Sequence, residues 1–289
     1  GGGGGPPGVA GGGGGAVILR VGGTLSFNGF IDVSGEDGQN NCSGNQGGGA
    51  GGTVNINANV LTGTGRAQAN GGKASTCNSY GGGGGGRVAA VATGADSSSL
   101  SLVAENPYGM CCGINGGAGT IYTKRPGEDP VLRFESPSAA AGQDSTVWPA
   151  SLGGATSLTV KELRTNNARP TFAGVSLVIT STAVFTGGGA LTVSTQAVTF
   201  PDVETVFPSG LTVTIATISA PLTSSFTFNS ATLNVSSMTA GAVLLTGSAA
   251  LEQRSTVQIL LSSMTMQTGT TLRHQANSTA EKIFAVNVK

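Results

Sequence analysis

Gly-Gly-Gly-Gly-Gly at residues 11–15, followed by Ala-Val-Ile-Leu at residues 16–19, decides the fold because the same pattern returns along the chain. A glycine run followed by a short β-type segment occurs four times. The first β-type residues after the runs are Val17, Val54, Val88 and Ile121, so the pattern recurs at a nearly constant interval. Repeats of about 20–50 residues are typical of solenoids, in which each repeat forms one coil and stacks on the preceding one. The period therefore predicts a solenoid.

The composition favours a folded chain with few charges. Of 289 residues, 50 are glycine, 10% are charged and 5% are aromatic, which argues against a conventional globular core. Disorder of the whole chain is the alternative. It is opposed by the 38% of hydrophobic residues, which occur in short alternating blocks, and by a charge too low to keep a chain open.

The charge balance bears on possible partners. With 14 basic and 14 acidic residues the net charge is zero, which makes nucleic acid an unfavourable partner and favours association between copies. The sequence contains no apolar run long enough to predict a membrane span. The chain opens on Gly1 with neither an initiator Met nor a signal peptide, so we expect a processed product or a segment of a longer protein.

Three sections follow one another along the chain. Residues 1–125 hold the long glycine-rich repeats. Residues 126–155 contain four prolines and are expected to form a Pro-rich connector or an edge excursion, because proline cannot donate to a strand ladder. Residues 156–289 are rich in Thr, Ser and Val, and a β-sandwich is the alternative architecture for this section.

The last section shows short alternating strands. They begin at Leu158, Leu177, Leu191, Leu211, Leu233 and Val257. Most of these starts are separated by the length of one short coil, and a coil of about 20 residues suits a three-sided β-helix, with Leu, Val and Ile inward and Thr, Ser and Asn outward. No long segment has a helical period. The predicted fold is therefore all-β: a parallel β-helix (β-solenoid) with glycine-rich coils first and shorter Thr/Ser/Val-rich coils after them.

The glycine runs are longer than a single corner requires. Stacked coils lie about 4.8 Å apart, and glycine permits both positive φ and close approach of backbones. A run is either a flexible tract or an ordered glycine strand or polyglycine-type helix packed against its copies. Its recurrence in every repeat favours the ordered form.

The four cysteines recur with the same period as the glycine runs. Cys42, Cys77 and the pair Cys111 and Cys112 all lie in the loop before a glycine run, at nearly equal intervals. Stacked coils would bring them within the ~4.4–6.8 Å between Cα atoms that disulfides need. We expect disulfides, with Cys77 bonded to a neighbouring coil. Free thiols are the alternative, and no CxxC spacing supports zinc.

The repeat resembles the glycine-rich parallel β-helix repeats of very large secreted or cell-surface proteins of protists, algae and bacteria. The resemblance covers the section 1–125, and it is carried by Gly29-Phe30-Ile31-Asp32-Val33-Ser34-Gly35, by Gly65-Arg66-Ala67-Gln68-Ala69-Asn70-Gly71, and by the run 81–86 with Arg87-Val88-Ala89. It implies a pectin-lyase-like β-helix, an extracellular location and structural or adhesive roles.

The sequence offers no constellation that predicts catalysis. β-Helix hydrolases and lyases cluster carboxylates, or basic residues with bound calcium, on one face. Asp32 is expected to align with Gln68 and Leu102 of later repeats, which supply no second carboxylate. Glu36-Asp37 and Glu128-Asp129 are interpreted as solvated turns, and the single histidine, His274, has no partner by spacing. We therefore expect no catalytic, cofactor-binding or metal-binding residues, and no enzyme.

Three N-glycosylation sequences occur, at Asn41, Asn234 and Asn277. Asn41 is expected in a loop, Asn277 in a polar segment, and Asn234 in a strand with its side chain outward. The expected protein is an extracellular or cell-surface structural protein, a subunit of a fibre, filament or surface layer that assembles with itself head-to-tail or laterally, with glycans as possible ligands or modifications. The alternatives are a polysaccharide-binding or polysaccharide-degrading β-helix and an adhesin passenger.

Overall fold

The computed structural model describes residues 10–38, 47–74, 81–107, 116–137, 145–148, 156–255, 257–274 and 286–288. The secondary-structure elements in these residues are all strands, which confirms the predicted all-β class. The chain divides into unit 1, Gly1–Thr146 with Asn167–Arg169, and unit 2, Val147–Asn166 with Pro170–Lys289. In each unit the strands pair mostly in parallel and follow one another in sequence order, as in a β-solenoid.

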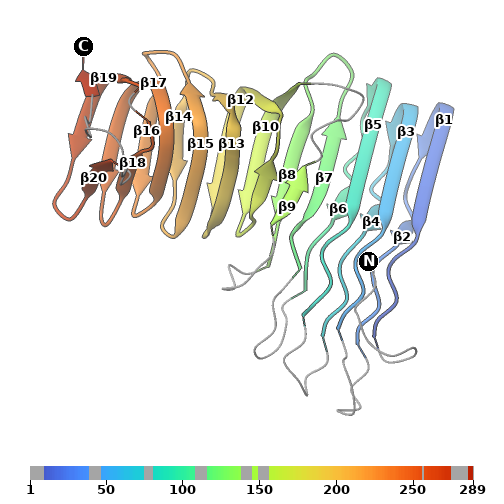
Figure 1. Cartoon of the computed structure of the whole chain (residues 1–289). Helices are drawn as coiled ribbons and strands as arrows, with labels where there is room; N and C mark the ends of the chain where they lie inside the picture. Colours follow the sequence, from blue (N-terminus) through green and yellow to red (C-terminus); the bar gives the residue numbers. More distant parts are fainter. Residues whose placement is uncertain are drawn as a thin grey trace. The chain divides into compact units, whose positions relative to one another are not determined.

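Unit 1 has two ladders of parallel strands (Figure 1). The first joins β1 (Ala16–Ser26), β3 (Thr53–Thr62), β5 (Arg87–Asp96) and β7 (Gly119–Lys124). The second joins β2 (Phe30–Asp32), β4 (Arg66–Gln68) and β6 (Ser101–Val103). We call a stretch of chain that contributes one strand to each ladder of a unit a coil. The residues used to measure the period align in a single row, as predicted: Val17, Val54, Val88 and Ile121.

The alternating side chains of these strands build the core of unit 1. In β3, Val54, Ile56 and Ala58 point inward and are fully buried, whereas Asn55 and Asn57 alternate with them on the outer side. Val88, Ala90 and Ala92 repeat the inward positions in β5. The alternation of the sequence therefore fixes which face of each coil is buried.

The glycine runs are ordered and form a hydrogen-bonded network beside the ladders. The two middle runs, residues 47–52 and 81–86, donate in two directions: to the run of the next coil, and to the preceding segment that returns from the second ladder (residues 33–38 and 69–74, the return segments). Amides three positions apart donate in the same direction, at 2.8–3.2 Å. Toward the next run, Gly48 donates to Gly81 and Gly51 donates to Gly84. Toward the return segment, Gly49 donates to Glu36 and Gly52 donates to Val33. A three-residue period with no bonds inside the run is that of a polyproline II-type helix. The structure thus agrees with the ordered form that the sequence favours, and of the two ordered forms it has the polyglycine-type helix.

This network leaves no room for side chains at many run positions. A Cβ atom added to Gly49 would lie 1.9 Å from the carbonyl oxygen of Gly12, and one added to Gly83 would lie 1.8 Å from that of Gly49. Backbone atoms cannot move aside as the tip of a side chain can. The runs are therefore glycine because neighbouring backbones occupy the space that a Cβ would fill.

The last strand of unit 1 departs from the parallel pattern. β8 (Val131–Glu135) pairs antiparallel with β7 and buries Leu132 and Phe134 completely. This strand lies in residues 126–155, the section predicted to form a Pro-rich connector or an edge excursion. β9 (Thr146–Trp148) lies at the point of the chain where the units divide.

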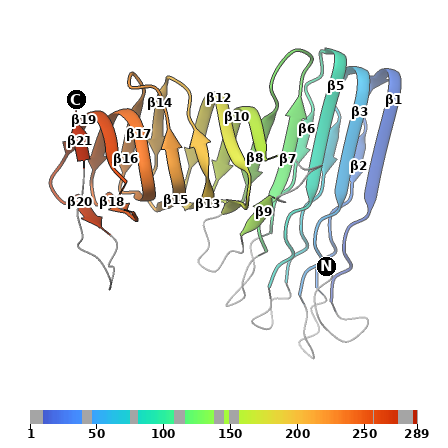
Figure 2. The ribbon, with the colours of Figure 1, turned by 45° about the horizontal axis from the view of Figure 1, so that its top comes forward.

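Unit 2 has three ladders, each built from successive coils that are shorter than those of unit 1 (Figure 2). Its strands are β10 (Ser157–Asn166), β11 (Pro170–Phe172), β12 (Ser176–Thr186), β13 (Gly189–Thr199), β14 (Glu204–Phe207), β15 (Leu211–Ser219), β16 (Ser225–Asn229), β17 (Thr232–Thr246), β18 (Ala250–Gln253), β19 (Ile259–Met266), β20 (Thr271–His274) and β21 (Val286–Val288). Several long strands bend and contribute to two ladders: β17, for example, pairs with β15 along its first part and with β16 along its last. The described pairs in this unit are parallel, unlike those of the alternative β-sandwich.

The register corrects one detail of the sequence prediction. Leu158 aligns with Leu177 as expected, but Leu177 then aligns with Val198 rather than with Leu191. Leu191 belongs to a different ladder, where it aligns with Val213. The unusually short interval from Leu177 to Leu191 therefore joins two different sides of a coil and is not a full coil.

Candidate assembly surface

Among the described residues, the first coil of unit 1 has one edge with no paired strand, which we call the free edge. Among the described strands, β1 pairs only with β3, and β2 pairs only with β4. The backbone N–H and C=O groups along the other edge of β1 can accept a further strand. In Figures 1 and 2, β1 is accordingly the outermost blue strand of its ladder.

The core layer of this first coil is half covered. Its inward aliphatic side chains are only partly buried, whereas the aligned side chains of the next coil have exposed fractions of 0–1%. The aligned pairs are Val17 with Val54, Leu19 with Ile56, Val21 with Ala58, Leu25 with Leu61, and Ile31 with Ala67. The chemistry of the two rows is the same, so the difference arises because β3 has a coil on each side and β1 has a coil on one side only.

Two large apolar side chains on the outer side of this coil add to the exposed apolar surface. Ile18 in β1 is 57% exposed, and Phe30 in β2 is 59% exposed. Neither belongs to the inward row. The first coil therefore exposes apolar groups both along its edge and on its outer face.

The outer face of the second ladder carries a small mixed cluster, which we call the Phe30 cluster: Phe30, Asp32, Arg66 and Gln68. The guanidinium carbon of Arg66 lies 5.9 Å from the centre of the Phe30 ring. The amide nitrogen of Gln68 donates to the Asp32 carboxylate at 2.8 Å. A hydrogen bond from the Ser34 side chain is the main reason that the pKa of Asp32 is lowered; the Ser34 N–H, Gln68 and Arg66 act in the same direction, and partial burial opposes them.

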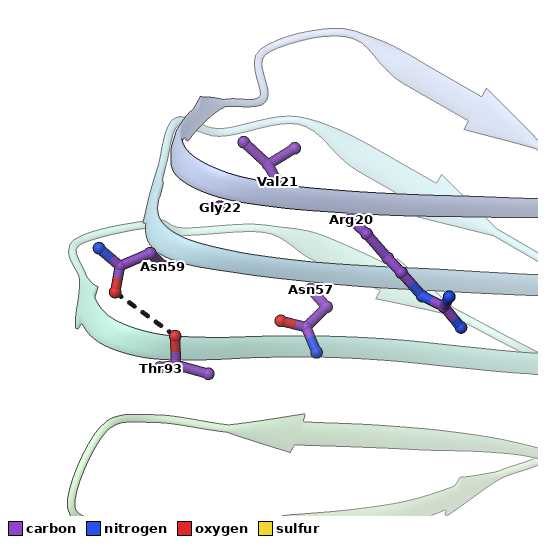
Figure 3. A pocket seen from close by; sticks show the side chains of 6 residues that line it. All are labelled: Arg20, Val21, Gly22, Asn57, Asn59 and Thr93. Carbon is purple, nitrogen blue, oxygen red and sulfur yellow. Dashed lines mark hydrogen bonds between the residues drawn. The ribbon is translucent and has the colours of Figure 1, made fainter.

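A shallow polar hollow of about 400 Å³ lies on the outer face of the first ladder (Figure 3). It is lined by Arg20, Val21 and Gly22 from β1, Asn57 and Asn59 from β3, and Thr93 from β5. The Thr93 hydroxyl lies 3.4 Å from Oδ1 of Asn59. The strand register shifts here in both β1–β3 and β3–β5, which turns the ladder and opens the hollow. Its lining offers amides, a hydroxyl and a guanidinium, so a molecule in this hollow would be held by hydrogen bonds.

The acidic residues singled out in the sequence hold neighbouring segments of chain together. Asp32 aligns with Gln68 as predicted, but the next residue of that row is Val103 and not Leu102, because Leu102 points into the core. Glu36 accepts the Gly12 N–H at 3.2 Å. Asp37 accepts the Lys73 N–H at 2.6 Å, between coils. Glu128 and Asp129 are exposed, in and after the turn that precedes β8.

The predicted modification sites divide into two groups. The disulfide candidates Cys42, Cys77, Cys111 and Cys112, and the glycosylation candidates Asn41 and Asn277, lie outside the described residues. Asn234 lies in β17 and is 7% exposed, and its amide nitrogen is 3.2 Å from the Thr214 hydroxyl. The side chain leaves the core face as alternation requires, but the neighbouring strands cover it.

The last coils of unit 2 contain a feature that the sequence reasoning missed. One inward row of this unit runs through Val193, Ile215 and Val235, and then continues into Gln253 and His274. Gln253 is 0% exposed, and its Oε1 has no hydrogen-bond partner among the described residues. Nε2 of His274 lies 3.1 Å from the Ser255 carbonyl oxygen. The change from apolar to polar side chains along this row becomes visible only when the strand register shows which residues are aligned.

Comparison with protein-family models, with curated proteins and with solved structures gives no match to the chain. In the part of the chain that the structure describes, His, Cys, Asp and Glu form no group of three that could hold a metal ion. The described residues also include no helix with the length and apolarity that a membrane crossing requires. The first coil, with its free edge and half-covered core layer, is the candidate functional surface.

Proposed function

We propose that the chain is an extracellular or cell-surface structural protein, a parallel β-helix (β-solenoid) that assembles with copies of itself. Its subunits join by stacking of solenoid ends, together with lateral contacts, into a fibre, filament or surface layer. The role is structural rather than enzymatic.

The half-covered core layer of the first coil carries this proposal. Leu19 and Ile56 occupy equivalent positions, yet only Ile56 is completely buried. Covering a Leu or Val side chain contributes about 1.5–3 kcal/mol, so a coil stacked on this edge would gain stability from several inward residues at once. The backbone groups of the same edge would gain hydrogen bonds in the same step.

The charge balance supports association. A net charge of zero gives copies of the chain no overall electrostatic reason to stay apart. Within the described residues, the outer strand of the first coil contains one charged residue, Arg20, among its eleven. Apolar contact along this edge is therefore opposed by little like-charge repulsion.

The proposed location is supported by the sequence alone. The four cysteines recur at one place in the glycine-rich repeat, which suits disulfides between stacked coils in an oxidising compartment. The resemblance to secreted and cell-surface glycine-rich repeats points the same way. Peptide mapping of the unreduced protein tests the disulfides: linked peptides containing Cys77 support an extracellular location, and four free thiols in protein taken from its source contradict it.

Electron microscopy of the protein isolated from its source without denaturation tests the assembly. Filaments or sheets with a regular repeat are the expected result. The purified chain should also sediment as oligomers whose size increases with concentration. Monomers at every concentration, together with dispersed single particles in the micrographs, would overturn the proposal.

The Phe30 cluster favours a second candidate function, the binding of a polysaccharide. An exposed aromatic ring beside a carboxylate, a carboxamide and a guanidinium can stack on a sugar ring and hydrogen bond to its hydroxyl groups. Titration calorimetry with soluble polysaccharides tests this function. The variant Phe30→Ala should lose the heat of binding, while Phe27→Leu, in the core of the same coil, should keep it. No heat with the natural protein would exclude this candidate for the polysaccharides tried.

A further inference from the structure

We infer that unit 2 binds to the surface of ice crystals through the outer face of one of its three ladders. This surface, which we call the hydroxyl face, consists of two columns of side chains. The first column contains Ser157, Ser176, Ala197, Thr217 and Ser237, and the second contains Thr159, Val178, Thr199, Ser219 and Thr239. The activity goes beyond the proposed structural role and does not depend on it.

The register of five successive coils produces the two columns. In the second column, Thr159 aligns with Val178, and Val178 aligns with Thr199. Thr199 then aligns with Ser219, and Ser219 aligns with Thr239. The two columns lie two positions apart along each strand, so both project from the same side of the sheet. The side chains therefore form an array that repeats in two directions.

The composition of the hydroxyl face is uniform. All but two of its side chains carry a hydroxyl group, and the exceptions, Val178 and Ala197, are small and apolar. The two columns hold no charged and no aromatic residue. The other two ladders of unit 2 carry ion pairs on their outer faces: one has Arg164 with Glu162, and the other has Arg273 with Glu252. The array is thus a property of one face and not of the whole surface.

The hydroxyl face is open to solvent and rests on a fixed layer. Ser219 and Thr239 are exposed, whereas Ile218, on the inner side of the same sheet, is 1% exposed. The hydroxyl groups of Thr217 and Ser237 lie 3.0 Å apart, within hydrogen-bond distance of each other. In this ladder β12, β13, β15 and β17 each have a paired strand on both sides. The spacing of the array is therefore set before any ligand binds.

The repeat in two directions indicates a crystalline ligand. Neighbouring coils lie about 4.8 Å apart, and alternate residues of a strand lie about 6.6 Å apart. Oxygen atoms repeat at similar distances on surfaces of hexagonal ice, so water molecules held by one pair of side chains would be in place for the next pair. A rigid lattice can meet many preorganised groups at once, whereas a flexible ligand must first be ordered.

The chemistry of the face favours ice over other crystalline surfaces. An ionic mineral would call for charged side chains, and the two columns contain none. A crystalline polysaccharide would be bound best by aromatic rings that stack on its sugars, and these are absent from the columns as well. Hydroxyl groups can donate to and accept from lattice water, while the small apolar groups beside them hold no water of their own.

Freezing measurements on the purified full chain test the inference. The natural chain should hold the freezing temperature of an ice crystal below its melting temperature. Ser219→Tyr, in the middle of the hydroxyl face, should abolish this gap, because the larger side chain prevents close approach of the lattice. Thr212→Tyr should keep the gap, since Thr212 is also exposed on β15 but belongs to another ladder. Tyrosine is favourable in strands, and circular dichroism with thermal unfolding checks that both variants fold.

Partition into slowly growing ice provides a second measurement. The natural chain and Thr212→Tyr should be enriched in the ice, and Ser219→Tyr should stay in the liquid. A natural chain with neither a freezing gap nor enrichment would overturn the inference, and so would equal behaviour of the two variants. Retention on crystalline cellulose or chitin that is lost in Ser219→Tyr, without any effect on ice, would assign the face to a polysaccharide instead. Sedimentation measures self-assembly separately, so failure of ice binding would leave the proposed function standing.

Discussion

The rings of Phe207 and Phe228 lie 4.4 Å apart and within 2° of parallel, on successive coils of unit 2. Phe207 also stacks on Phe185 of the preceding coil, at 5.0 Å. The register of β14 and β16 produces the first of these contacts, because it aligns Phe207 with Phe228. A single ladder of unit 2 thus carries a column of stacked rings in its core.

Phe207→Ala should destabilise unit 2 by about 3–5 kcal/mol, because it removes the middle ring of this column and leaves a cavity. Urea unfolding followed by circular dichroism measures the change. Val206→Ala is the control, since Val206 is the neighbouring residue of the same strand and is 45% exposed; it should change stability by less than about 0.5 kcal/mol. Equal effects of the two substitutions would show that the column contributes little.

The glycine network makes an equally specific prediction. Gly49→Ala places a methyl group 1.9 Å from a backbone oxygen, whereas a Cβ at Gly15 meets no atom within 4 Å. We expect Gly49→Ala to destabilise unit 1 by at least about 1–3 kcal/mol. Gly15→Ala should be neutral or slightly stabilising, because it reduces the freedom of the unfolded chain. Similar thermal unfolding temperatures for the two variants would argue against an ordered network.

The lowered pKa of Asp32 predicts how stability depends on pH. The folded protein holds the Asp32 proton less tightly than the unfolded chain, so this residue stabilises the fold above its ordinary pKa of 3.8. That contribution is lost as the pH falls from this value through the folded pKa. Because the carboxylate is largely exposed, the effect is small.

Thermal unfolding between about pH 5 and about pH 2 measures this effect. Asp32→Asn should show a shallower loss of stability with falling pH than the natural chain. Ser34→Ala should shift in the same direction, because the Ser34 side chain supplies the largest part of the pKa change. Identical pH profiles for all three proteins would assign the acid sensitivity to other groups.

The position of Asn234 predicts which glycosylation sequence stays empty. Its amide nitrogen lies against Thr214 and its side chain is 7% exposed, so a glycan there is incompatible with the paired strands β15 and β17. Glycopeptide mass spectrometry of folded protein from a eukaryotic secretory host should find Asn234 unmodified. Asn234→Gln should then secrete a protein of unchanged glycan mass. A glycan on Asn234 in folded protein would contradict the packing of these strands.

The repeat could be predicted from sequence because equal spacing in the chain becomes equal register in a parallel ladder. Val54 and Val88 hold the same place in successive repeats, and they are aligned partners for this reason. The directions in which the runs donate hydrogen bonds to other segments could not be predicted, because glycine has no side chain whose alternation would reveal a period of three. That the Asn234 side chain is covered could not be predicted either, because alternation assigns a residue to the outer face but does not say whether neighbouring strands cover it.

The difference in burial between Leu19 and Ile56 could not be predicted from the sequence. Leu19 and Ile56 are both aliphatic residues at the same repeat position, so no property of the residues distinguishes an end coil from an inner one. The polar end of unit 2 was missed because Gln253 and His274 belong to one row only through the register of β18 and β20. In both cases the decisive information is what lies on the adjacent coil.

The network of glycine runs has a mechanical consequence. In an ordinary sheet the bonds between strands lie in one plane, but here each run is tied both to the next run and to a return segment. Tension that separates two coils would load these bonds together with those of the two strand ladders, so no single row would carry the whole force. Shear between a run and its return segment would be resisted by the second set of bonds. A material built from such coils would be stiff in more than one direction without relying on bulky side chains.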